Sequence, residues 1–235
     1  MPVHRIRAIT LDLDDTLWAI GPVIRRAEAE LWQWLAANYP RIPQQVTQDG
    51  LSQVRVQVMD EHPDRSHDFR FLRKQALARV ALLSGYSDDL VEPAFDIFDA
   101  ARNRVEFFPD VLPVLEALAP RYRLIALTNG NASLQRIGIR HLFHDVVTAV
   151  EAGAAKPARP IFEEAVRRAG VDRAQILHVG DHPENDVEGA RSAGLRSAWM
   201  NRNGNDWPKQ LSRPDAILTS MSELHDLLLA AKAET

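Results

Sequence analysis

The stretch RAITLDLDDT, residues 7–16, decides how this chain is interpreted, because an apolar run ends there in three carboxylates within four positions. Alternate side chains of an extended segment share a face, so Asp12 and Asp14 can point the same way. Like charges so close together repel unless a cation or a proton lies between them. The pair therefore indicates either a site for phosphoryl chemistry or an acidic turn that caps the next helix.

The composition is that of an ordinary globular chain. Its 235 residues are 46% hydrophobic and 26% charged, which excludes a collagen-like or low-complexity protein. A net charge of -4 gives no support for nucleic acid as a partner, and the absence of cysteine excludes disulfides, a thiolate nucleophile and cysteine-ligated zinc. With no signal pattern and no apolar stretch near the roughly 18 residues that span a bilayer, we expect a cytoplasmic monomer or homodimer without a membrane partner.

The chain alternates between two kinds of sequence in large blocks. Residues 18–105 contain no convincing strand, and their apolar spacing predicts a bundle of four helices. These helices are expected at 23–39, 46–60, 67–84 and 88–104.

From residue 106 onward, helical patterns alternate with short apolar strands. With the first strand at 6–11, this predicts an α/β fold, a doubly wound (Rossmann-like) parallel sheet. The expected domains are an α/β core of residues 1–17 and 106–235, and an inserted helical cap of residues 18–105. The further strands are expected at 123–127, 146–149, 176–179, 197–200 and 216–218.

Ligands of open parallel sheets bind at the carboxyl ends of the strands, where Asp12 lies. A second strand ends in Thr128, Asn129 and Gly130, whose hydroxyl, amide and free backbone N–H groups suit phosphate oxygens. The same residues would also form a simple turn with a helix cap.

Two more strand ends carry charged groups. Lys156 stands alone in a loop of small residues, as a solvated side chain or as a fixed positive charge against phosphate. Asp181 and Asp186 follow the strand at 176–179 with a spacing that suits Mg²⁺, although capping alone could explain Asp186. We interpret His178 as a partly buried strand residue and His182 as a loop side chain.

Four motifs now stand in order along the chain: DLDDT at 12–16, TNG at 128–130, KP at 156–157, and GD at 180–181 followed by Asp186. Together they resemble the motifs of the haloacid dehalogenase-like hydrolase superfamily, and the helical insertion is similar to the cap of its subfamily I. The runs at 68–71, 127–132 and 176–181 look most like bacterial phosphatases of flavin mononucleotide and of 5-amino-6-(5-phospho-D-ribitylamino)uracil in riboflavin biosynthesis.

The resemblance implies a hydrolase of small phosphate esters that works with Mg²⁺. Asp12 would attack phosphorus and form an aspartyl-phosphate, while Asp14 would give a proton to the leaving group and later take one from water. The metal would be held by Asp12, by Asp14 through its backbone carbonyl, and by Asp181, with Asp186 supporting its waters or orienting Lys156.

The same resemblance assigns the substrate contacts. Thr128 and Lys156 would take part in catalysis by holding the transferring phosphoryl oxygens, together with the N–H groups around Asn129 and Gly130. Trp18 could stack on a planar substrate ring or pack at the hinge between the two parts of the chain.

Three rival functions differ in what they need from these residues. Dehalogenation has no need for a second carboxylate as proton shuttle, so Asp14 favours phosphate esters. A phosphomutase would share the aspartyl-phosphate but keep water from it. A receiver-like phospho-signalling module would place its phosphorylated Asp at the end of a later strand, and the strand at 146–149 has no Asp at its end.

Overall fold

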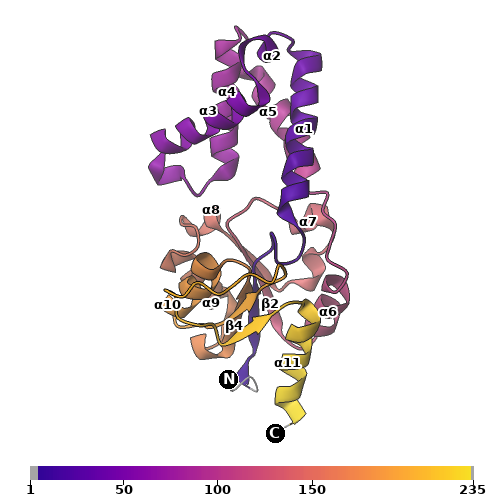
Figure 1. The fold of residues 1–235 in the computed structure, drawn as a ribbon, viewed down its shortest axis with the longest axis vertical. Coiled ribbons are helices and arrows are strands. Elements are labelled where there is room, and N and C mark those ends of the chain that lie inside the picture. The colour runs from indigo at the N-terminus through magenta and orange to yellow at the C-terminus, as the bar shows by residue number, and fades with distance from the viewer. Residues whose placement is uncertain (1–4, 234–235) are drawn as a thin grey trace. The chain divides into compact units, whose positions relative to one another are not determined.

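The computed structural model describes residues 5–233, and the chain divides into two compact units, which Figure 1 draws with all their elements. An α/β unit holds the residues up to 19, 106–130 and those from 138 onward, and a helical unit holds 20–105 and 131–137. Residues 131–137, which the sequence pattern places in the core, group with the helical unit. The reason is local: Ser133 N donates to Asn103 Oδ1 at 2.6 Å, and Arg136 pairs with Asp99 at 2.5 Å.

The α/β unit is built on a six-stranded sheet in the order β3-β2-β1-β4-β5-β6, in which every pairing is parallel. This confirms the predicted fold class. Ala8 in β1 aligns with Arg123 on one side and Ile176 on the other, so the first strand lies at the centre. The strands are β1 (Ala8–Leu11), β2 (Arg123–Thr128), β3 (Asp145–Thr148), β4 (Ile176–Gly180), β5 (Arg196–Met200) and β6 (Ala216–Leu218).

Short helices connect these strands, and α9 packs on β2 and β3 through a buried cluster that includes Ile125, Val147 and Phe162. After β4 the chain forms a π-helical turn at Pro183–Glu188 and then α10, and Asp186 lies in the wider turn. The helices of the unit are α6 (Val111–Leu118), α8 (Ala149–Ala152), α9 (Arg159–Ala169), α10 (Gly189–Ser192) and α11 (Met221–Ala233).

The helical unit packs α1 against α5 and α3 against α4 around a core that contains Leu31, Leu77 and Phe95. The expected helix at 88–104 begins as a 3₁₀ turn at Asp88–Leu90 before α5. Within residues 5–233, no helix is both long enough and apolar enough to cross a bilayer. The helices are α1 (Ile20–Asn38), α2 (Ile42–Gln45), α3 (Gln48–Glu61), α4 (Phe69–Leu83), α5 (Val91–Arg102) and α7 (Leu134–Ile137).

Candidate active site

Asp12 extends the ladder of the sheet by one residue beyond β1. Its N–H donates to the carbonyl of Val179 in β4 at 2.9 Å, which fixes the carboxylate at the carboxyl edge of the sheet. The chain then turns sharply, because Asp15 takes a left-handed conformation with φ 58° and donates its N–H to the Trp18 carbonyl at 2.7 Å. Aspartate tolerates this conformation better than most residues. Asp15 therefore builds the turn.

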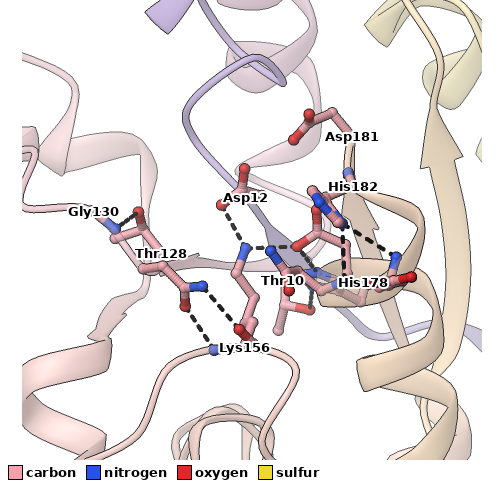
Figure 2. A network of polar contacts seen from close by, with 12 residues as sticks. Thr10, Asp12, Thr128, Gly130, Lys156, His178, Asp181 and His182 are labelled. Atoms are coloured by element: carbon pink, nitrogen blue, oxygen red, sulfur yellow. Dashed lines mark hydrogen bonds and ion pairs between the residues drawn. The ribbon is translucent and has the colours of Figure 1, made fainter. Parts of the chain in front are cut away.

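A buried ammonium joins two of the predicted carboxylates. Lys156 Nζ donates to Asp12 Oδ1 at 2.5 Å and to Asp186 Oδ1 at 2.6 Å, and Figure 2 shows it reaching Asp12 from the loop below. Asp12, Lys156 and Asp186 are 7%, 5% and 1% exposed, so the ion pairs lie where water screens them little. The strand ends predicted from sequence thus converge.

His178 continues this network, a contact that sequence reasoning missed. Its Nε2 lies 3.1 Å from Asp186 Oδ1, and its Nδ1 lies 2.8 Å from the hydroxyl of Thr10, its register partner in β1 (Figure 2). Burial lowers the pKa of His178, which favours a neutral ring that donates to Asp186 and accepts from Thr10. The sequence places His178 near the end of a strand, two residues before Gly180. Its contact with Thr10 depends on strand register, which the sequence alone does not give.

The three carboxyl groups of the cluster, Asp12, Asp181 and Asp186, differ in the direction in which their pKa values are shifted. Burial raises the pKa of Asp12 well above its usual range, with Lys156 opposing and Asp186 adding to the effect. Burial also opposes ionisation of Asp186, but Lys156 and His178 outweigh it and hold that pKa below the usual range. Burial and the neighbouring Asp186 raise the pKa of Asp181 to about 7. One ammonium is therefore too little charge for three carboxylates.

The same three carboxylates could hold a metal ion. One oxygen from each of Asp12, Asp181 and Asp186 lies within 4.8 Å of the others. A hard cation such as Mg²⁺ prefers this all-oxygen set and neutralises the excess negative charge. Among the described residues, the side chain of Asp14 does not belong to this cluster.

Asp186 depends on its neighbours for its position. Its Oδ2 accepts from the N–H of His182 at 2.9 Å, and Gly180 leaves room for its carboxylate, because a Cβ at position 180 would lie 2.3 Å from Asp186 Cγ. Trp199 in β5 holds the adjacent segment, since its indole N–H donates to the carbonyl of Asp181 at 2.6 Å. Nothing in the spacing of Trp199 pointed to this contact.

The segment after β2 has two separate roles. Thr128 Oγ1 accepts from the N–H of Gly130 at 2.9 Å, which folds the loop tightly at the strand end (Figure 2). The side-chain amide of Asn129 binds the backbone of Lys156. Its Oδ1 accepts from the N–H of Lys156 at 2.7 Å, and its Nδ2 donates to the carbonyl of Lys156 at 3.0 Å. The second motif thus positions the third.

Asp14 and Trp18 form a pair of their own. The indole N–H of Trp18 donates to Asp14 Oδ1 at 2.9 Å, and the ring meets Phe107 edge-on with centroids 5.7 Å apart. Trp18 is fully buried. The expectation that its ring stacks on a substrate gains no support from these contacts, which make it a partner of the carboxylate instead.

Comparison with known proteins identifies related hydrolases. Residues 6–194 match the family described as haloacid dehalogenase-like hydrolase. The 5-amino-6-(5-phospho-D-ribitylamino)uracil phosphatase YigB of Escherichia coli (strain K12) is 30% identical, over 97% of this chain and 98% of its own.

Two solved structures share the architecture. A 2-haloacid dehalogenase from Pseudomonas syringae pv. Tomato DC3000 is 39% identical, with a TM-score of 0.89 over 96% of this chain and 98% of its own. A phosphatase from Thermococcus onnurineus, 24% identical with a TM-score of 0.67 over 95% and 98% of the two chains, shares the fold.

Proposed function

Since this chain belongs to the haloacid dehalogenase-like hydrolase family, we propose that it hydrolyses a small phosphate monoester through an aspartyl-phosphate on Asp12, with Mg²⁺ as cofactor. At the level of reaction class it is a phosphoric monoester hydrolase. The observation that carries the proposal is a second carboxylate, Asp14, two residues beyond Asp12 and oriented by a hydrogen bond from Trp18.

Asp12 is suited to attack phosphorus. Its carboxylate lies at the strand end, and the ammonium of Lys156, 2.5 Å away, opposes the burial that raises the pKa of Asp12, as a bound cation would also do. Once Asp12 binds the phosphoryl group, the same ammonium lies beside the new charges, where a fixed cation lowers the barrier most. Asp14 donates a proton to the departing alkoxide and then accepts one from the water that cleaves the aspartyl-phosphate.

The phosphoryl oxygens have two further groups of the α/β unit available. Thr128 closes the end of β2, and its hydroxyl, which accepts from the Gly130 N–H, keeps its own hydrogen to donate. The N–H of Asn129 supplies a second donor. Asp12, Asp181 and Asp186 are the residues that would hold a divalent cation. When bound, that cation neutralises charge on the phosphoryl group.

The substrate we propose is a phosphorylated flavin precursor or flavin mononucleotide. The similarity to YigB along nearly the whole of both chains supports it. Selection among phosphate esters is assigned to the helical unit, whose sequence resembles a subfamily I cap.

The dehalogenase likeness makes carbon–halogen cleavage the second candidate, because that structure is 39% identical. The two reactions share the nucleophile and differ in the proton shuttle. Phosphate release from flavin mononucleotide, the ribitylaminouracil phosphate and sugar phosphates is therefore measured beside halide release from both enantiomers of 2-chloropropionate, with and without Mg²⁺.

We expect phosphate release that depends on Mg²⁺, and little halide. Asp12→Asn should lose activity, whereas Asp14→Asn should lose phosphate release and would leave halide release intact in a true dehalogenase. Full phosphatase activity in Asp12→Asn would contradict the nucleophile. Transfer of phosphate to a second sugar hydroxyl, dependent on a bisphosphate activator, would indicate a mutase instead.

A further inference from the structure

A cavity of about 280 Å³ opens within the helical unit, between α3 and α4. Much of its wall is apolar and open to solvent: Val56, Phe69 and Met59 are 54%, 48% and 38% exposed. Such side chains normally gain by being covered. The volume lies just below the usual range of ligand pockets, so a small molecule fits where a protein segment would not.

The charged side of the cavity has more cation than anion. Arg55 and Arg73 both line it, and both pair with the same oxygen of Glu28: Arg55 Nη1 donates to Oε1, and Arg73 Nη1 lies 3.0 Å from it. One carboxylate thus serves two guanidinium groups, so one positive charge remains uncompensated within this cluster.

The two arginines are held in place by different contacts. The guanidinium of Arg73 stacks 3.4 Å from the ring centre of buried Phe98. Arg55 also bonds Ser52 Oγ, at 3.1 Å. Burial and the nearby charge of Arg55, opposed by Glu28, lower the pKa of Arg73 to about 10. Arg73 is still charged at neutral pH, so a bound anion would stabilise this buried positive charge.

We propose that this cavity is a binding site for a small organic anion with an aromatic body and a single acidic group. Phe69 and Met59 contact the aromatic body, as ring faces and thioethers do. Arg55, the more exposed of the two arginines, binds the acidic group, and Arg73 adds to the field from behind it. The site lies wholly in the helical unit and does not depend on the hydrolytic reaction proposed for the α/β unit.

The test uses the full chain with 8-anilinonaphthalene-1-sulfonate, and with N-phenyl-1-naphthylamine as the same ring system without the acid. Titration calorimetry should give one site per chain for the sulfonate and at least a tenfold weaker affinity for the neutral amine. Equal affinities would overturn the proposal, because the charge would then contribute nothing. Binding should persist in Asp12→Asn, which separates this site from the fate of the hydrolase assignment.

Two substitutions should move the affinity in opposite directions. Arg55→Gln should weaken sulfonate binding about tenfold, as expected for loss of a charge-assisted hydrogen bond. Glu28→Gln should strengthen it, because the arginines then lack their internal anion. A merely damaged fold would not produce both results, and circular dichroism checks that each variant is folded. Binding unchanged in both variants would overturn the site.

Surface variants test the apolar wall. Phe69→Ala should weaken binding severalfold, while Leu83→Ser, at a 61% exposed leucine on the same helix but outside the cavity, should leave it unchanged. An equal loss in both would mean nonspecific adsorption. A second copy of the chain is the other conceivable cover. If the sulfonate does not bind, and if the chain forms a dimer that Met59→Glu dissociates, the ligand site is overturned. The cavity is then part of a dimer interface.

Discussion

The absence of a side chain at Gly180 leaves room for the carboxylate of Asp186. A Cβ at this position would lie 2.3 Å from Cγ and 2.4 Å from Oδ2 of Asp186, closer than real side chains approach. Asp186 cannot retreat without giving up its bonds to Lys156 and to the His182 N–H. The methyl group of an alanine would therefore disturb the carboxylate cluster from behind, without touching a substrate.

The first prediction follows for Gly180→Ala. We expect roughly a 10- to 100-fold loss of kcat, the range seen when the support of a metal ligand is removed. Steady-state phosphate release measures it. The matched control is Gly21→Ala, where the added Cβ meets only the flexible end of Arg25 at 3.3 Å, and activity should not change. Normal activity in Gly180→Ala would mean that the position of Asp186 does not matter.

A second prediction concerns the hydrogen bond from Trp18 to Asp14. Trp18→Phe keeps an aromatic ring against Phe107 but removes the indole hydrogen bond to Asp14. We expect kcat to fall several-fold for alkyl phosphates and less for p-nitrophenyl phosphate, whose leaving group needs little protonation. Comparison of the two substrates measures it. An equal loss for both would assign Trp18 to packing alone.

At the scale of elements, Arg202 in the loop after β5 contacts both the loop after β1 and the residue before α6. Its guanidinium pairs with both oxygens of Asp110 at 3.1 and 3.2 Å, and its Nε donates to the Thr16 carbonyl at 2.9 Å. Asp110 also accepts from the N–H of Met221 at 2.5 Å, where α11 begins. The loop after β5 therefore braces the loop that carries Asp14.

The third prediction is a pH dependence of stability from Asp110. Burial opposes its ionisation, but the bonds from Arg202 and Met221 outweigh burial and lower its pKa. A carboxylate whose pKa is lowered by folding contributes its full stabilisation above its unfolded-state pKa of about 3.9. This stabilisation is lost as the pH falls through its folded-state pKa. Asp110→Asn should thus cost about 1–3 kcal/mol at pH 7, and the gap to wild type should close below about pH 4.

Urea unfolding at several pH values measures this gap. Glu163→Gln is the control: hydrogen bonds from Arg173 and Arg159 lower the pKa of Glu163 to about 2, but these pairs lie at the surface, where water screens them. Its effect on stability should be small at every pH. A gap for Asp110→Asn that stays constant down to pH 2 would contradict the assignment.

At the scale of the molecule, the sequence predicted the sheet and the meeting of Asp12, Lys156, Asp181 and Asp186, because carboxyl ends of parallel strands share one edge. It did not predict the contact of Thr10 with His178, since that requires the register of β1 on β4. Nor did it predict the π-helical turn before α10, because a single turn with i→i+5 bonds is too short to show its own apolar period in the sequence.

The fourth prediction tests the carboxylate cluster without catalysis. Binding of Mg²⁺ only to the folded chain should raise its Tm, by roughly 5–10 °C near a hundredfold excess over Kd. Differential scanning fluorimetry measures the shift. Asp181→Asn should lose most of it, whereas Asp49→Asn, at an exposed acid on α3, should keep it. An identical shift in both variants would place the cation elsewhere.

The central position of β1 has a consequence for how the chain is made. Ala8 pairs with Arg123 and Ile176, so β1 leaves the ribosome about 115 residues before its earliest neighbour in the sheet. At usual rates of translation this delay is on the order of ten seconds. Throughout it, the apolar segment AITL has no strand to pair with and offers nascent-chain chaperones a target.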